Sequence, residues 1–183
     1  MAFLKKKYLP AKVGKFEKIS EVEFYDYISG YGFDKGEEAK LKDEYNREFS
    51  QTGPRRSTSG SAGYDFKAWA DFIVPAHQSV IIPTFIKCKI QTGWMLCMYP
   101  RSGMGFKYGV HLANTIGVID SDYYGCEAND GHIMVKLVNP SDKDILIKRG
   151  EKFCQGIFIP FGITEDDAPI FNERSGGIGS TGK

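Results

Sequence analysis

Residues 79–99 read SVIIPTFIKCKIQTGWMLCMY, and this stretch decides the fold class. It holds two short apolar runs that are rich in β-branched and aromatic side chains and are bounded by turn-forming residues. Runs of the same kind occupy residues 132–139 and 153–161. Many short strands at this spacing, without helical patterns between them, are typical of a sandwich or barrel of antiparallel strands. The sequence after residue 60 therefore predicts an all-β domain.

The part of the chain before these strands carries two helical signatures. Ser20 with Glu23, and Asp34 with Glu37, each have the spacing of a capping box, in which a polar side chain and a carboxylate satisfy the first free N–H groups of a helix. Apolar side chains follow at helical spacing. They are Val22, Phe24, Tyr25 and Ile28 after the first box, and Ala39, Leu41, Tyr45 and Phe49 after the second. We therefore expect a short helical insertion at about residues 20–49, closed by the turn-rich residues 51–60.

The length of 183 residues suits one domain with a core of its own. We expect a single β domain over residues 1–173 and a flexible, glycine-rich arm at residues 174–183 (RSGGIGSTGK). The formal charge of +1 gives no sign of a surface for nucleic acid or membranes. The helical insertion has no evident role in a β fold, which leaves a protein partner of residues 20–49 as one explanation.

The cysteines and the N-terminus bear on the compartment. Cys88, Cys97, Cys126 and Cys154 are far apart and form no CxxC pair, so we expect free and mostly buried thiols. The first ten residues contain three lysines but no apolar run behind them, which is not the pattern of a signal peptide or a membrane span. The sequence predicts a cytoplasmic protein.

Residues 100–103 (PRSG) follow one of the predicted strands and carry groups that suit an oxyanion. The Arg101 guanidinium can bond two phosphate oxygens at once, Ser102 can donate a hydrogen bond, and Gly103 lets backbone N–H groups approach closely. By itself the same sequence is also an ordinary turn.

Residues 114–123 (NTIGVIDSDY) are more specific. An apolar run broken by Gly117 delivers Asp120 and Asp122 at its end, with an amide, Asn114, and an aromatic ring, Tyr123, at the borders. A carboxylate at the end of a strand beside a bound triphosphate can orient and deprotonate a water molecule. A polar turn between strands would explain the two aspartates, but not the flanking amide and ring.

Five motifs occur in the order in which the trimeric dUTPases carry them. They are residues 61–65 (SAGYD), 100–103 (PRSG), 117–123 (GVIDSDY), 150–160 (GEKFCQGIFIP) and the glycine-rich arm. Through these motifs the chain resembles that family. The resemblance implies a jelly-roll-like fold, hydrolysis of dUTP to dUMP and pyrophosphate, and a homotrimer whose active sites combine residues of neighbouring chains.

The resemblance also implies a role for individual residues. Asp120 would be the catalytic base that activates water for attack on the α-phosphorus, and Tyr123 would pack on the deoxyribose and exclude a 2′-hydroxyl. Uracil would be bound by the Asn114 side chain and by backbone groups. These groups belong to Gly117, Val118 and Ile119 and to the return strand near Met134, while Ile178 stands where the family usually has a phenylalanine that stacks on uracil.

For the triphosphate, the resemblance implies contacts from several parts of the chain. They come from Arg101, Ser102, Gly103 and Gln155, and from Arg174, Ser180 and Thr181 in the arm. Asp65 would support the site and the water molecules of the metal. Mg²⁺ would be held through the phosphates and water, with no direct protein ligand. Residues 126–132 (CEANDGH) lengthen the hairpin after the third motif beyond that of many relatives.

Two other functions remain open. A dCTP deaminase has a similar fold and shares several of the motifs, and a regulatory module could bind dUTP without hydrolysing it. Residues 117–123 favour the hydrolase over the deaminase, and the presence of Asp120 argues against an inactive binding module.

Overall fold

Within residues 10–168, the strands form four small antiparallel sheets. A computed structural model describes the backbone of residues 10–168 and, except at 48–52, their side chains. Within these residues the strands are β1 (Gly14–Lys18), β2 (Tyr64–Lys67), β3 (Phe72–Val74), β4 (Ser79–Pro83), β5 (Ile86–Ile90), β6 (Trp94–Pro100), β7 (His111–Leu112), β8 (Gly117–Ile119), β9 (Met134–Val138), β10 (Ile145–Ile147) and β11 (Lys152–Pro160). The predicted all-β, jelly-roll-like fold class is confirmed.

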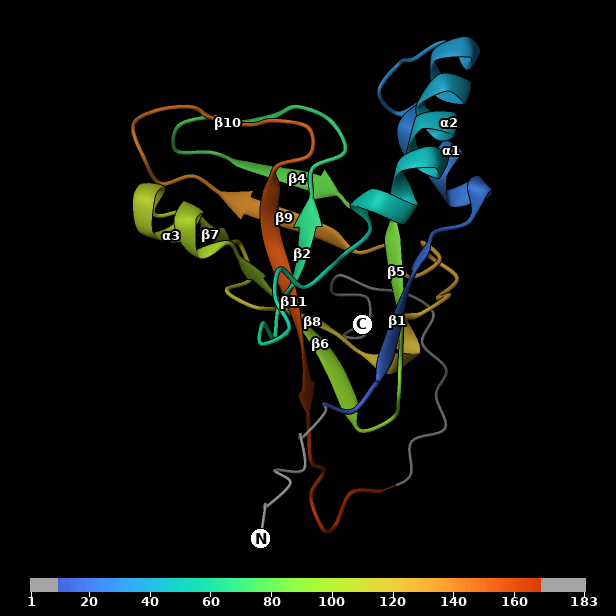
Figure 1. Ribbon diagram of the computed structural model, residues 1–183, viewed down its shortest axis with the longest axis vertical. Helices are drawn as coiled ribbons and strands as arrows, with labels where there is room; N and C mark the ends of the chain where they lie inside the picture. Colours follow the sequence, from blue (N-terminus) through green and yellow to red (C-terminus); the bar gives the residue numbers. More distant parts are fainter. Residues whose placement is uncertain (1–9, 169–183) are drawn as a thin grey trace, which may run out of the picture.

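The largest sheet has the strand order β2-β11-β6-β8, and a second has the order β4-β9-β7. Two further pairs, β1-β5 and β10-β3, complete the described strands. The long strand β11 runs through the centre of the molecule (Figure 1). On one edge its Gln155 lies opposite Asp65 of β2, and on the other it lies opposite Tyr99 of β6. The chain after β6 is thereby brought close to Asp65, which is far away in the sequence.

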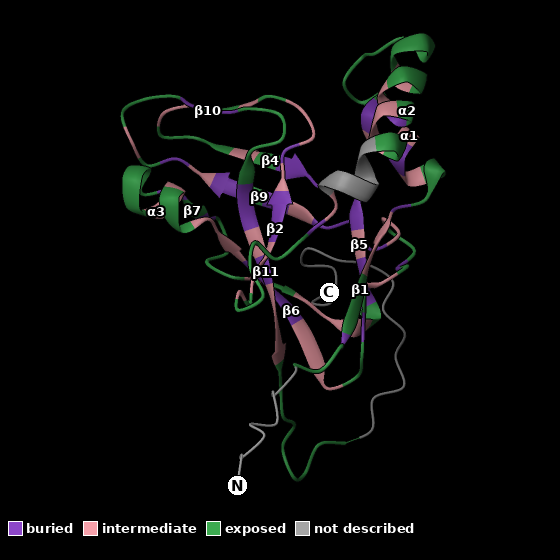
Figure 2. Ribbon diagram, viewed as in Figure 1, coloured by how far each residue is buried: buried purple, intermediate pink, exposed green. Residues whose placement is uncertain are grey.

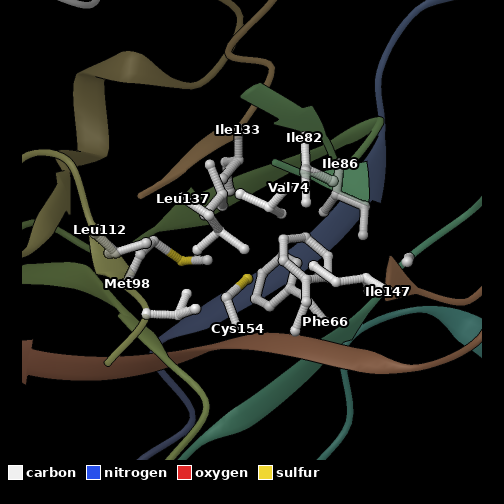
Figure 3. Packing of buried hydrophobic residues seen from close by; sticks show 14 of the residues in the cluster. Phe66, Val74, Ile82, Ile86, Met98, Leu112, Ile133, Leu137, Ile147 and Cys154 are labelled. Atoms are coloured by element: carbon white, nitrogen blue, oxygen red, sulfur yellow. The ribbon is translucent and has the colours of Figure 1, made fainter. Parts of the chain in front are cut away.

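The core lies between the sheets, where the buried residues of Figure 2 are concentrated on the strands. Figure 3 shows Phe66, Met98, Leu137 and Cys154 pointing into one cluster from four different strands. Burying a large apolar side chain of this kind stabilises the fold by about 1.5–3 kcal/mol. The four cysteines are buried and unbonded to each other, as expected from the sequence.

The predicted helices are present as α1 (Glu21–Ser29) and α2 (Lys35–Thr52), inserted between β1 and β2. They lie together on one side of the strands, away from α3 (Figure 1). Phe24 and Ile28 of α1 are buried against Phe85, which follows β4, and form a second and smaller core. Among the described helices, none has the length and apolar character needed to cross a bilayer.

The sequence does not predict α3 (Ser102–Tyr108), which starts inside the PRSG motif. Two glycines among its seven residues disfavour a helix by propensity. The helix is closed at its end by Gly109, which has φ 70° and donates its N–H to the carbonyl of Gly105. A further single turn, η1 (Ser121–Tyr123), follows β8.

Candidate functional site

A hollow of about 350 Å³ lies beside β6, β8 and β9 and is bordered mainly by apolar side chains. Six residues that the sequence assigns to base or sugar binding line it together. They are Asn114, Gly117, Val118, Ile119, Tyr123 and Met134. The other lining residues are Ile81, Met98, Leu112, Ala113, Val135 and Lys136. A mostly apolar hollow with a few convergent polar groups is the usual form of a small-molecule site.

Gly117 sets the shape of this hollow where β8 meets β6. A Cβ atom at this position would lie 3.2 Å from Cβ of Met98 and 3.8 Å from Nδ2 of Asn114. A larger residue would push β8 away from β6 or displace the Asn114 amide. Glycine therefore lets an amide and a backbone segment approach the same space.

Asp120 follows Ile119, the last residue of β8, and precedes the single turn η1. Its backbone is extended, with φ −82° and ψ 161°, and its carbonyl accepts a hydrogen bond from the Tyr123 N–H at 3.2 Å. This bond forms the single turn η1, which brings the Tyr123 ring back into the protein, where it is 6% exposed. Asp120 itself is half-buried, so the turn separates a carboxylate that water can reach from a ring that borders the hollow.

The second part of the candidate site is an ionic cluster around Asp65, which is 5% exposed. Its carboxylate forms an ion pair with Arg101, lies 2.8 Å from Nζ of Lys152 and accepts a hydrogen bond of 2.6 Å from Oγ of Ser57. Burial alone would raise the pKa of Asp65. The hydrogen bonds from Lys152 and Ser57 and the charges of Arg101 and Lys152 outweigh burial and hold its pKa below the ordinary value.

The residues assigned to phosphate binding surround this cluster. Arg101 stands at the N-cap of α3, and Ser102 and Gly103 are the first residues of that helix, both exposed. Gln155 lies on β11, and its Nε2 is 3.5 Å from the carbonyl oxygen of Pro100. Arg101 and Gly103 line a second, open hollow of about 840 Å³ together with Lys152. In one chain, the base-binding candidates thus line one hollow, while two of the phosphate-binding candidates, Arg101 and Gly103, line another.

Several residues that contribute to the hollow or to the ionic cluster cannot be identified from the sequence. Ser57 and Lys152 bond to each other at 2.7 Å across 95 positions of the chain. Asn129 and the carbonyl of His132 contact the Tyr123 hydroxyl. Lys152 lies inside the fourth motif, but a lysine at the start of an apolar run is also common where a strand begins in solvent, so the motif does not single it out. No pattern of neighbouring residues identifies these hydrogen-bond partners.

Some predictions fall outside the described residues. Arg174, Ile178, Ser180 and Thr181 lie in residues 169–183, so their assigned contacts stay predictions. Within residues 10–168 there is no group of three or more His, Cys, Asp or Glu side chains that could hold a metal ion. The carboxylate nearest to the phosphate-binding candidates, Asp65, is already neutralised by two cations.

Comparison with known proteins gives a consistent result. The dUTPase family matches residues 50–182 of the chain. The deoxyuridine 5′-triphosphate nucleotidohydrolase of Lactococcus lactis is 42% identical over 130 residues, which are 70% of this chain and 87% of that protein. The corresponding protein of Haemophilus ducreyi is 38% identical over 78% of this chain and 93% of its own length. The crystal structure of a dUTPase from Streptococcus mutans superposes with a TM-score of 0.58 and 38% identity, covering 61% of this chain and 88% of that one.

Proposed function

The chain belongs to the dUTPase family, and on this premise we propose how its residues carry out the hydrolysis of dUTP to dUMP and pyrophosphate. The observation that carries the proposal is the hollow of about 350 Å³ in which six residues of the family pattern meet, with Asp120 directly after one of its lining strands. Its lining suits a flat ring that has apolar faces and polar edges, which describes uracil, with the deoxyribose beside it.

Uracil is bound through hydrogen bonds by the amide of Asn114 and by backbone groups of residues 117–120. A thymine methyl group would clash with this part of the hollow. Cytosine presents a reversed donor and acceptor pattern and would leave buried polar groups unpaired. The ring of Tyr123 packs on the sugar and leaves no room for a 2′-hydroxyl, so UTP is excluded by shape.

Asp120 is the general base. Its carboxylate takes a proton from a water molecule, and the oxygen of that water forms a bond to the α-phosphorus. The bond from this phosphorus to the oxygen that bridges to the β-phosphate breaks, and pyrophosphate leaves with its electron pair. Half-burial of Asp120 supports this role, because a base in this reaction must be reached by water.

The triphosphate is bound by Arg101, Ser102, Gly103 and Gln155, with Arg174, Ser180 and Thr181 of an arm at residues 174–183 closing over its end. We propose that Mg²⁺ is held by the phosphate oxygens and water, because Mg²⁺ keeps several water ligands and often binds through the phosphates of the substrate. Mg²⁺ neutralises charge on the phosphates when it is bound. Asp65 holds Arg101 and Lys152 in place through the ionic cluster.

The complete site is shared between the chains of a homotrimer. The position of Arg101 and Gly103 in a hollow other than the base-binding one supports this arrangement, because a neighbouring chain could bring its phosphate-binding residues to the base-binding hollow of the first. The reaction takes place in the cytoplasm, where four free thiols stay reduced. Light scattering of the purified protein measures the trimer directly, and a monomer that is fully active would contradict it.

Residues 20–49 are the best candidate for a protein-binding surface. Val22, Tyr31 and Phe33 are exposed, and the rings of Tyr31 and Phe33 stack on each other. Exposed aromatic side chains are common at protein interfaces. A Tyr31→Ser, Phe33→Ser double variant should lose a partner that the unchanged protein captures, while its rate of dUTP hydrolysis stays the same.

The test of the reaction is Asp120→Asn, which keeps the shape of the side chain and removes the base. Release of pyrophosphate from dUTP should fall at least about 10³-fold, while dUTP still binds. The same assay on dTTP, dCTP and UTP tests specificity. Ammonia release from dCTP without pyrophosphate release from dUTP would assign the chain to deamination, and full turnover by Asp120→Asn would remove Asp120 from the mechanism.

A further inference from the structure

The loop at residues 125–132 contacts Tyr123 through its hydroxyl and its backbone carbonyl. None of its residues lines the hollow. We infer that Asn129 of this loop is a positioning residue, which fixes the Tyr123 ring through its hydroxyl and so sets the discrimination between deoxyribose and ribose. This inference rests on the proposed contact between Tyr123 and the sugar.

The Tyr123 hydroxyl is held from two directions. Nδ2 of Asn129 donates a hydrogen bond to it at 2.7 Å, and the hydroxyl donates its own proton to the carbonyl of His132 at 3.0 Å. The donor and an acceptor site of the hydroxyl are both used, which fixes the far end of the ring as well as its Cβ end. A ring held at both ends cannot tilt away from a bulkier sugar.

Asn129 is itself held in place by the loop. Its Oδ1 accepts hydrogen bonds from the N–H of Gly131 at 3.2 Å and from Sγ of Cys126 at 3.1 Å. The amide orientation follows from these contacts, because the oxygen faces two donors and the nitrogen faces the Tyr123 oxygen. Replacement of Asn129 by an apolar residue would therefore remove the donor of the 2.7 Å hydrogen bond to the Tyr123 hydroxyl.

The loop is anchored outside the hollow, at the start of the helical insertion and on strand β5. Asp130 accepts a hydrogen bond of 2.6 Å from the N–H of Ser20, and both of its carboxylate oxygens contact Nζ of Lys87, at 2.7 and 2.8 Å. The side chains of Lys87 and Asp130 are 15% and 21% exposed, so this ion pair is largely shielded from water. Helix α1 thereby supports the loop that supports Tyr123.

A double-mutant cycle of Asn129→Ala and Tyr123→Phe tests the inference. The ratio of kcat/KM for dUTP to that for UTP should fall about tenfold in Asn129→Ala, which corresponds to the loss of one hydrogen bond of ordinary net strength. In Asn129→Ala, the change in this ratio should come from changes in KM, and kcat for dUTP should stay nearly unchanged. Tyr123→Phe keeps the ring and removes the hydroxyl, so adding Asn129→Ala to it should change the ratio by less than about twofold.

The outcomes separate the inference from its premise. If Asn129→Ala leaves the ratio unchanged, or lowers it equally with and without the Tyr123 hydroxyl, Asn129 does not act through that hydroxyl and the inference is wrong. Tyr123→Ala is the control for the premise. If it leaves the dUTP to UTP ratio unchanged, Tyr123 does not face the sugar and the proposed site is wrong instead.

Discussion

Helices α1 and α2 begin with the same sequence signature and end up in different surroundings. At the start of α2, the signature forms a complete capping box. Oδ1 of Asp34 accepts a hydrogen bond from the N–H of Glu37 at 2.9 Å, and the Glu37 carboxylate accepts one from the N–H of Asp34 at 2.9 Å. Both residues are exposed. Both hydrogen bonds join residues 34 and 37, so they require no contact with a distant part of the chain.

At the start of α1, only half of the box forms. Oγ of Ser20 accepts a hydrogen bond from the N–H of Glu23 at 3.2 Å, as predicted. The N–H of Ser20 bonds to Asp130 instead of to Glu23, and the Glu23 carboxylate lies 3.3 Å from Nδ1 of the buried His132. The N–H of Ser20, which a complete capping box would bond to Glu23, is therefore bonded to the loop that contacts Tyr123. Three predictions use this difference.

The largest effect is expected from a matched pair of glycine substitutions. Gly131, in the loop at α1, has φ 77°, and a Cβ there would lie 2.5 Å from the carbonyl oxygen of Tyr123. Gly32, before α2, has φ 74° and open space around it. Gly131→Ala should lower the free energy of unfolding by about 4 kcal/mol, since steric overlap adds to backbone strain, whereas Gly32→Ala should cost about 1 kcal/mol.

Urea denaturation of both variants measures these costs, and dUTP hydrolysis at low temperature measures the effect on the site. Gly32→Ala should leave kcat/KM unchanged. Equal losses of stability in the two variants would show that the loop gives way as easily as an exposed turn.

The second prediction is a dependence of stability on pH that comes from the α1 side. Burial lowers the pKa of His132 to about 4, with the charge of Asp130 opposing this in part. Nε2 of His132 accepts a hydrogen bond from the N–H of Phe85 at 3.0 Å, so protonation would break that bond. The unfolded chain binds a proton at about pH 6.5 and the folded protein only near pH 4, so stability is complete above pH 6.5 and falls as the pH decreases toward 4.

Over this range His132 should remove about 3 kcal/mol of stability. Burial raises the pKa of Glu23, which acts in the opposite direction and makes the net slope smaller. Asp65, whose pKa is lowered, loses its contribution only at a more acidic pH. Urea denaturation from pH 7.5 to 4 measures the slope. His132→Gln keeps an acceptor for Phe85 and does not titrate, so an unchanged slope in that variant would exclude His132 as the source.

The smallest effects are expected when each glutamate is replaced by alanine. Glu23→Ala leaves Nδ1 of His132 without its carboxylate in a fully buried position and should cost about 1 kcal/mol. Glu37→Ala removes one exposed hydrogen bond and should cost about 0.5 kcal/mol. Thermal denaturation compares the two. Glu37→Ala should also leave the dUTP to UTP ratio unchanged, and a loss of stability larger than that of Glu23→Ala would contradict the comparison.

The sequence predicts which residues belong to much of the site, but it does not predict how these residues are paired in space. Asn114, Gly117, Tyr123 and Met134 line one hollow, as the family pattern suggests. The pattern does not show that Arg101 is paired with Asp65, or that Lys152 and Ser57 complete the cluster. These partners are supplied by β2 and β11, or by the loop before β2, and strand pairing is a property of the whole sheet.

The sequence by itself determined the features that depend on neighbouring residues. Short apolar runs bounded by turn-forming residues specify strands. The spacing of Asp34 and Glu37 specifies the start of α2, because the interacting groups are within a few residues of each other. Tertiary structure alone decided where Glu23 points and what holds Tyr123. The partner of Glu23 is His132, which is 109 residues away. The partner of Tyr123 is Asn129, which is only 6 residues away but reaches the hydroxyl because residues 125–132 fold back against α1 and η1. A local pattern fixes which groups need a partner, whereas the packing of distant segments decides which partner each group obtains.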